Sequence, residues 1–356
     1  MKRESLPDRE PKSPAEEAIA VCVRVGTVMV GAVTHCTPHD GKRGGKMKIL
    51  VIGAGALGAF FGACLLKAGR DVTFVVRPAR AAQMAANGLR VRSPAVDFAV
   101  VPPVVIADQL REPVDLILLC VKSYSLPEAM EQFAAAVGPQ TAILPVLNGI
   151  AHIETLSARF GAERVLGGAS LVSGALDADG HVDVPMAGGI VFGEITGAIT
   201  ERCRSIATLF NGTAAPARAS EVVMQDMWEK FTFLVAGNSL SCLMRTSLGH
   251  ILLAPGGRDM IARACNEVRT VAAACGFPPR QAYVDRILGV YNTDGSPLKA
   301  SMLRDMERGA PTEGEHTIGD MVSRARRYGV ATPFLDIAYS MVGAYESARQ
   351  RDVAAH

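Results

Sequence analysis

Apolar runs and helical patterns alternate along the chain from Met47 onward. Residues 48–52 form an apolar, β-branched run, which is typical of a strand buried on both faces. A glycine-rich turn and an apolar helical pattern follow, Gly69 ends that pattern, and "DVTFVV" (71–76) is the next strand-like run. This β-α-β order favours a parallel sheet.

The alternation continues to about residue 213, and then the pattern changes. Strand-like runs are found at 89–93, 98–107, 114–122, 141–149, 164–176, 180–188 and 189–194, with helical patterns at 79–88, 125–138 and 200–212. Beyond a break at 214–220, only helical patterns occur, at 221–246, 257–275, 280–290, 297–308, 312–328 and 333–349. We therefore predict an α/β protein with a doubly wound parallel-sheet domain (47–220) and an all-helical domain (221–350).

Residues 1–46 do not fit this scheme. A charged, proline-bearing lead precedes an apolar run at 19–36 that Arg24 interrupts. The run is too short and too interrupted for a membrane span, and its charges are not placed as in a signal peptide. His35, Cys36 and His39 lack the spacing of a strong metal site, so we predict no metal. We expect a disordered or extraneous extension.

Composition bears on the partner and on the compartment of the protein. The 356 residues carry a formal net charge of +2, and no cluster of Lys and Arg with interleaved aromatics occurs, which argues against nucleic-acid binding. The eight cysteines are scattered without a CxxC pair or a paired framework. We therefore expect reduced thiols and a cytoplasmic protein.

The turn "GAGALG" (53–58) carries the first chemical signal. Gly53, Gly55 and Gly58 form G-x-G-x-x-G between a predicted strand and a predicted helix. The first glycine permits the tight turn, the second lets the backbone approach a pyrophosphate, and the third allows close packing. We assign this turn of a Rossmann-type domain, including Ala56 and Leu57, to dinucleotide binding. A flavin or a nucleotide-sugar on the same fold is the alternative.

The end of the second strand bears on which dinucleotide binds. NAD enzymes usually place Asp or Glu there to bind the ribose 2′-hydroxyl. This chain has "FVVRPAR" instead, with Arg77 and then Arg80 and no acid. Because a guanidinium suits a 2′-phosphate, we predict NADPH and assign Arg77 to it. A solvated surface arginine is the alternative.

Several further motifs, in order and suitably spaced over about 47–350, resemble those of the ketopantoate reductase (2-dehydropantoate 2-reductase) family. They are "GAGALG", "LLCVKSY", "LPVLNG", "MWEKFTFLVAGNSL", "KASMLRDMERGAPTE" and "YGVATP". The resemblance implies a Rossmann domain, a helical domain and a site in the cleft between them. It also implies NADPH-dependent reduction of 2-dehydropantoate to pantoate, a step towards pantothenate and coenzyme A.

The resemblance also implies roles for individual residues. Lys230 fits the family's general acid, and Asn238, Ser301 and Glu313 fit its substrate-binding residues. Asn148 fits the residue at the nicotinamide, and Lys122 a basic position beside the cofactor. The chemistry agrees, because a protonated lysine stabilises the charge that develops on a carbonyl oxygen and then delivers a proton.

Each of these residues also has a plain structural interpretation. A lysine in the middle of a helix is usually solvated. Asn148 precedes Gly149 and could serve only a turn, and Lys122 could be a surface residue. Ser301 could cap a helix, and Glu313 could complement a helix dipole.

The chain departs from the family's pattern at the substrate. Leu234 stands one turn after Lys230, where the family usually has a second Asn, and Leu cannot form a hydrogen bond. Gly314 and His316 are also unusual, and we interpret His316 as an exposed helical residue. These differences favour a substrate with a more apolar or differently placed side group.

We therefore carry three functions forward. The leading one is an NADPH-dependent reductase of 2-dehydropantoate, and a paralogous reductase of another 2-keto acid is the second. A non-catalytic NADPH-binding sensor is the third, although it has no need of a proton donor. A homodimer is the commonest assembly and is our expectation.

Overall fold

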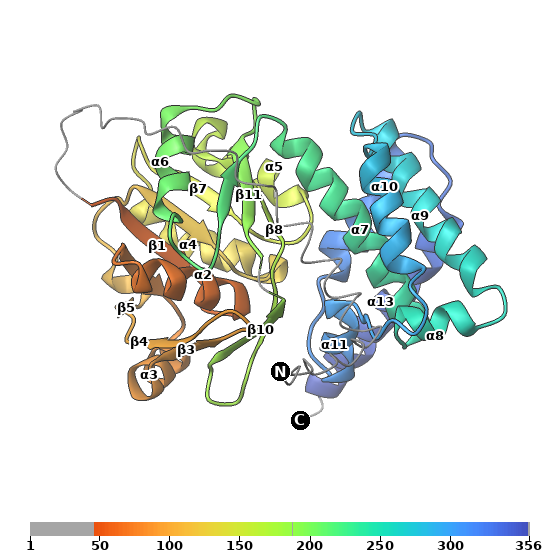
Figure 1. The fold of residues 1–356 in the computed structure, drawn as a ribbon, viewed down its shortest axis with the longest axis horizontal. Helices are drawn as coiled ribbons and strands as arrows, with labels where there is room; N and C mark the ends of the chain where they lie inside the picture. The colour runs from red at the N-terminus through yellow and green to blue at the C-terminus, as the bar shows by residue number, and fades with distance from the viewer. Residues whose placement is uncertain (1–45, 187, 355–356) are drawn as a thin grey trace, which may run out of the picture.

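The computed structural model of the protein describes residues 46–186 and 188–354. The expectations for 1–45, including the apolar run and the residues His35, Cys36 and His39, lie outside this range. Strands gather in one half of the molecule, and helices α7 to α13 make up the other (Figure 1). This arrangement confirms the predicted α/β sheet domain and the helical region that follows it.

A parallel sheet forms the centre of the first half. Its five strands lie in the order β5-β2-β1-β6-β7 and all pair in parallel. They are β1 (Lys48–Ile52), β2 (Asp71–Val75), β5 (Val104–Val105), β6 (Leu116–Leu119) and β7 (Ala142–Pro145). Helices α2 (Ala56–Lys67), α3 (Pro78–Asn87), α4 (Leu126–Phe133) and α5 (Ala151–Phe160) connect or follow these strands. The carboxyl ends of β1, β6 and β7 therefore meet at one edge, where ligands of open α/β sheets bind.

Two smaller sheets complete this half. One has the order β4-β3-β10-β9 and the other β12-β11-β8. Their strands are β3 (Leu89–Arg92), β4 (Asp97–Val100), β8 (Leu166–Ser170), β9 (Ser173–Leu176), β10 (Val182–Met186), β11 (Ile190–Glu194) and β12 (Ala217–Ala219). Helix α6 (Glu201–Leu209) precedes β12.

Some elements differ from the sequence prediction. The run 164–176 is two strands, β8 and β9, which belong to different sheets. Within the predicted break at 214–220, residues 217–219 form strand β12 and pair with β11. Helix α5 was missed, as was α8 (Leu248–Leu253), whose 6 residues are too few to show a helical period.

The second half is built around the long helix α7 (Val223–Met244). The elements that follow are α9 (Gly257–Ala274), α10 (Gln281–Tyr291), α11 (Ser301–Glu307), the π-helical turn η5 (Glu315–Gly319), α12 (Asp320–Arg327) and α13 (Pro333–Ala354). The helical pattern at 312–328 thus begins with a π-turn, a feature often found at functional sites. No helix in 46–186 or 188–354 is long and apolar enough to cross a bilayer.

The first half of α7 is anchored by the two residues that precede Lys230. Trp228 is buried and stacks on Phe277, with ring centroids 5.5 Å apart. The Glu229 carboxylate, only 3% exposed, accepts hydrogen bonds from Arg280 Nε at 2.7 Å and from the Arg280 backbone N–H at 2.9 Å. A buried carboxylate needs such partners, so this pair fixes the turn that carries Lys230.

Candidate active site

The glycine turn has the geometry of a dinucleotide-binding loop. Gly53 has φ +87°, a conformation that side chains disfavour, and a Cβ on Gly58 would lie 1.9 Å from the Gly53 carbonyl oxygen. A Cβ on Gly55 would meet nothing within 4 Å, so the backbone there is open to approach. Ala56 and Leu57 begin α2, whose N-cap Gly55 makes no side-chain capping bond. The free N–H groups of this first turn suit a pyrophosphate.

The two arginines after β2 have different surroundings. Arg77, the N-cap of α3, is 65% exposed as a side chain and pairs with Glu128 at 2.6 Å. Arg80 is part-buried and donates through Nε to the Ala54 carbonyl at 3.2 Å and through Nη2 to the Gly180 carbonyl at 2.8 Å. Arg80 therefore connects the glycine turn to the loop between β9 and β10. Arg77 is bound only to the exposed Glu128 side chain, which an anion could replace.

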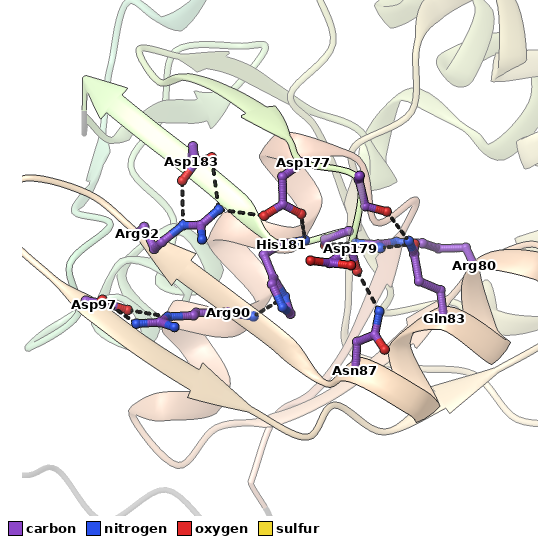
Figure 2. Close-up of polar contacts among 12 residues, drawn as sticks. Arg80, Gln83, Asn87, Arg90, Arg92, Asp97, Asp177, Asp179, His181 and Asp183 are labelled. Atoms are coloured by element: carbon purple, nitrogen blue, oxygen red, sulfur yellow. Dashed lines mark hydrogen bonds and ion pairs between the residues drawn. The ribbon is translucent and has the colours of Figure 1, made fainter.

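Figure 2 shows how the connection between β9 and β10 is fastened to α3. Besides the Arg80 bond, Gln83 donates to the Ala178 carbonyl at 3.1 Å and Asn87 to the Asp179 carbonyl at 3.0 Å. These side chains of one helix hold the backbone of a loop about 90 residues away in sequence. Helix α3, which carries Arg77 at its N-cap, is thereby attached to this loop.

Lys230 lies at the boundary between the two halves. Its side chain is half-buried, and Nζ donates to Asn148 Oδ1 at 3.3 Å, just beyond the carboxyl end of β7. Burial lowers the pKa of Lys230 to about 8, and the charge of Glu313 opposes that shift. A lysine with this pKa is a competent acid near neutrality, unlike the solvated lysine of the alternative interpretation.

Glu313 joins the helical half to the sheet half. Its carboxylate is 7% exposed and accepts hydrogen bonds from Asn148 Nδ2 at 3.1 Å, the Ser123 backbone N–H at 3.0 Å and Lys122 Nζ at 3.3 Å. These bonds join the two halves of the molecule, so Glu313 does more than complement a helix dipole. Asn148 likewise does more than form a turn, because its amide connects Lys230 to Glu313.

Lys122 pairs with two carboxylates of the helical half. Nζ lies 3.0 Å from Asp305 and 3.3 Å from Glu313, while the side chain stays 42% exposed. Burial alone would lower the pKa of Lys122, but the charges of Glu313 and Asp305 outweigh it, and the pKa is raised. Lys122 therefore remains a cation at the end of β6, at the edge where a cofactor would lie.

Asn238 lies two turns after Lys230 on α7, and Ser301 is the first residue of α11. The Asn238 side chain, on α7, is 4% exposed. Ser241, one turn further along α7, accepts a hydrogen bond from the Ala300 N–H at 3.4 Å, which brings the start of α11 to the helix. Ser301 makes no capping bond, because the N-cap of α11 is Ala300.

Leu234 lines a small hollow beside Lys230. The hollow contains about 210 Å³ of empty space, open solvent included. Its walls come from α7, β8 and the end of β7, namely Leu147, Gly149, Gly168, Ala169, Met227, Lys230, Phe231 and Leu234. Apart from the Lys230 ammonium, all of the side chains in this lining are apolar.

Two histidines lie near Lys230. His152 on α5 is buried, and its Nε2 has no partner within the described part of the chain. Burial lowers the pKa of His152 to about 3, and the nearby positive charges of Lys230 and His316 add to the effect. His316 is half-buried in the π-turn η5, where we had expected an exposed helical histidine. Its carbonyl oxygen packs against the Gly149 turn, 2.7 Å from where a Cβ would be.

The site thus unites Lys122, Asn148, Lys230 and Glu313 in one network, while Asn238, Ser301 and the glycine turn stand apart from it. Asp305 is a member that our sequence analysis missed. A signal existed, because Asp305 follows Ser301 by four residues in "SMLRD", the spacing that puts two side chains on one helix face.

Comparison with known proteins gives a consistent family. The family model described as ketopantoate reductase PanE/ApbA matches residues 49–197, and that of its C-terminal part matches 222–346. The uncharacterized oxidoreductase YkpB of Bacillus subtilis (strain 168) is 34% identical over 302 residues, which is 85% of this chain and 99% of YkpB.

Solved structures of similar proteins agree with this family assignment. The structure of 2-dehydropantoate 2-reductase from Methylococcus capsulatus is 31% identical, with a TM-score of 0.75 over 85% of this chain and 98% of that one. D-mandelate dehydrogenase in a ternary structure with NADH and anilino(oxo)acetate shares the fold, with 22% identity and a TM-score of 0.77 over 85% of this chain and 100% of that one. These relatives support an oxidoreductase, and the chain belongs to the ketopantoate reductase family.

Proposed function

We propose that this protein is an NADPH-dependent reductase of 2-keto acids, with 2-dehydropantoate as the first substrate to test. The observation that carries the proposal is Lys230, a half-buried lysine whose pKa is lowered to about 8 at the carboxyl edge of the parallel sheet. A structural lysine has no need of this position, whereas a general acid does. The activity in the printed name of the Methylococcus capsulatus relative supports the choice of reaction.

The residues of the site divide the reaction between them. When bound, a reduced nicotinamide would supply the hydride that reduces the keto carbon. Lys230 stabilises the negative charge that develops on the carbonyl oxygen and donates its proton there. This proton completes the 2-hydroxy acid, and the neutral amine then regains a proton from solvent, which restores the enzyme for the next turnover.

Asn148 and Glu313 hold Lys230 for this task. Asn148 Oδ1 accepts from the ammonium, and Asn148 Nδ2 donates to Glu313, so the amide orientation is fixed from both ends. Because Glu313 raises the pKa of Lys230 against the effect of burial, it also keeps the lysine protonated at neutral pH. We assign Asn238 and Ser301 to binding of the substrate.

The choice of NADPH rests on Arg77. Its exposed guanidinium follows β2, and its partner Glu128 is itself exposed, so a 2′-phosphate can replace that partner. Lys122 adds a second cation near the edge of the sheet. We expect a kcat/KM for NADPH well above that for NADH, and a preference for NADH would refute this part of the proposal.

The free thiols in the described part of the chain support a reducing, cytoplasmic setting. Pantothenate synthesis is the pathway that 2-dehydropantoate reduction would serve, and we propose a homodimer as the assembly. The decisive test of the function is NADPH oxidation, followed by absorbance, against a panel of 2-keto acids that includes 2-dehydropantoate. Binding of NADPH without turnover of any of them would favour a cofactor sensor instead.

A further inference from the structure

Helix α10 is attached to α7 at both of its ends, and the two attachments lie on either side of Lys230. At the beginning of α10, the N-cap Arg280 binds the Glu229 carboxylate through Nε at 2.7 Å and through its backbone N–H at 2.9 Å. At its end, the hydroxyl of Tyr291 donates to the backbone carbonyl of Phe233. One attachment therefore comes one residue before Lys230, and the other comes three residues after it.

The Tyr291 hydroxyl meets the backbone of α7 at a single hydrogen-bonding step. It donates to the Phe233 carbonyl and receives a hydrogen bond from the Gly237 N–H. In an α-helix, two such groups four residues apart are each other's partners. A side chain that enters this ladder is one of the causes that bend a helix. The contact therefore bears on the path of α7 just beyond Lys230.

Gly237 makes this close approach possible. A Cβ at that position would lie 2.7 Å from the Tyr291 oxygen, closer than real contacts allow, whereas the ring carbon Cζ is 3.5 Å away. Tyr291 is 1% exposed, and its ring stacks on Phe233 with centroids 5.2 Å apart. Because glycine in the middle of a helix is destabilising relative to alanine, this glycine is explained by the hydroxyl that it admits.

Between its two ends, α10 faces a hollow that it shares with α7 and α9. The hollow contains about 330 Å³ of empty space, open solvent included. Its lining includes Phe233, Ala236, Val284, Ile287 and Leu288. Apolar contacts of this kind have no preferred direction, whereas hydrogen bonds do. The bonds at Arg280 and Tyr291 therefore align the two helices.

We propose that α10 acts as a brace that places Lys230 for proton transfer, with Tyr291 as a positioning residue that acts through α7. The inference rests on the proposed 2-keto acid reductase function, because the placement of Lys230 matters to turnover only if Lys230 is the acid. A misplacement of about 1 Å in a reacting group can lower a rate about 100-fold, so a hydroxyl outside the site can control turnover.

Tyr291→Phe tests the brace, because it removes the hydroxyl and keeps the ring that stacks on Phe233. We expect kcat for the best 2-keto acid of the panel to fall about tenfold or more. KM should change less than kcat, because Lys230 acts on the charge that develops in the transition state. The Kd of NADPH, measured by fluorescence titration, should stay within about twofold, since the glycine turn lies in the other half of the molecule.

A second substitution separates positioning from stability. When Gly237→Ala is combined with Tyr291→Phe, the added methyl fills the space that the hydroxyl leaves and contacts the ring at 3.5 Å. The double variant should melt about 1–3 °C above Tyr291→Phe, because alanine favours the helix, and yet keep its low kcat. In the wild-type background, Gly237→Ala should instead lower the Tm, because the methyl meets the hydroxyl at 2.7 Å.

Tyr283→Phe is the matched control on the same helix. The hydroxyl of Tyr283 has Arg286, also of α10, as its hydrogen-bond partner, so its removal leaves both attachments to α7 in place. This variant should retain the wild-type kcat and KM.

The outcomes distinguish the brace from the function beneath it. If kcat recovers in the double variant, or if Tyr291→Phe turns over as fast as Tyr283→Phe, Tyr291 is a structural contact only, and the brace is overturned while the reductase function stands. Failure of the wild-type protein to oxidise NADPH with any 2-keto acid, although NADPH still binds, would overturn the proposed function and the positioning role together.

Discussion

The glycine turn and the Lys230 network are both parts of the candidate site, yet they are held together in opposite ways. The tightest contact in the turn is between backbone atoms within 53–58, and it requires glycine, since a Cβ at Gly58 would lie 1.9 Å from the Gly53 oxygen. The network is made by side chains whose partners lie 82 to 191 residues apart.

This difference indicates which kind of substitution should damage each region and which property should be lost. A turn built on close backbone approach is broken by added volume, and the loss should appear in cofactor affinity and stability. A network built on charges and amides is broken by removal of a proton or a partner, and the loss should appear in turnover. Each of the following predictions tests whether the two kinds of failure stay separate.

The largest effect is expected for Lys230→Ala. Removal of the general acid should lower kcat about 10²- to 10⁴-fold, the usual contribution of positioned acid catalysis, while the Kd of NADPH stays within a few-fold. Steady-state turnover and cofactor titration by fluorescence measure the two quantities. Lys48→Ala, at an exposed lysine of β1, is the matched control and should change neither. Turnover that survives Lys230→Ala would remove the lysine from the mechanism.

The turn is tested by two alanine substitutions that differ in kind. Gly58→Ala forces a methyl group into the Gly53 carbonyl and should cost about 1–3 kcal/mol of stability together with most cofactor affinity. Gly55→Ala places its methyl in open space, so the protein should fold normally but bind NADPH more weakly. Gly343→Ala, in the open on α13, should be harmless in thermal unfolding and in cofactor titration. If Gly58→Ala behaves like Gly343→Ala, the turn does not have the proposed tight packing.

The same contrast explains what could be predicted from sequence. The strand, turn and helix at 48–67 are local, so periodicity and three glycines were sufficient to predict them. The contacts of Glu313 with Ser123 and Lys122 depend on tertiary approach, and no local pattern encodes them. Strand β12 was missed for a related reason, because its 3 residues are defined by pairing with β11 and are not defined by their own alternation.

Arg77 should decide between the two nicotinamide cofactors. Arg77→Gln removes a charge-assisted bond to the 2′-phosphate, typically about 1.5–3 kcal/mol, so kcat/KM with NADPH should fall about 10- to 100-fold while that with NADH changes little. Arg80→Gln is the informative comparison. Because Arg80 is committed to the Ala54 and Gly180 carbonyls, its loss should lower thermal stability and affect both cofactors alike. Equal effects of the two variants on cofactor preference would contradict this assignment.

The pH dependence of turnover should follow Lys230. The protonated lysine is the active form and its pKa is lowered to about 8, so kcat/KM for reduction should be level below that pH. Above it, the rate should fall about tenfold per pH unit as the ammonium is lost. Lys230→Arg provides the check, because its guanidinium stays charged and the alkaline fall should disappear from whatever activity remains. An unchanged profile would assign the titration to another group.

The smallest effect is expected for a substitution in the surface ion pair between Arg77 and Glu128. Glu128 holds Arg77 at 2.6 Å, with side chains 53% and 65% exposed, and a 2′-phosphate must compete with it. Exposed pairs contribute about 0.2–1 kcal/mol, so Glu128→Gln should tighten NADPH binding by about two- to fivefold. NADH binding should not change, since no phosphate competes for Arg77 in that case. Because solvent ions screen an exposed pair, the gain should shrink as salt is raised. Weaker NADPH binding in Glu128→Gln would mean that Glu128 orients Arg77 for the phosphate, and the carboxylate would then belong to the cofactor site as a positioning residue.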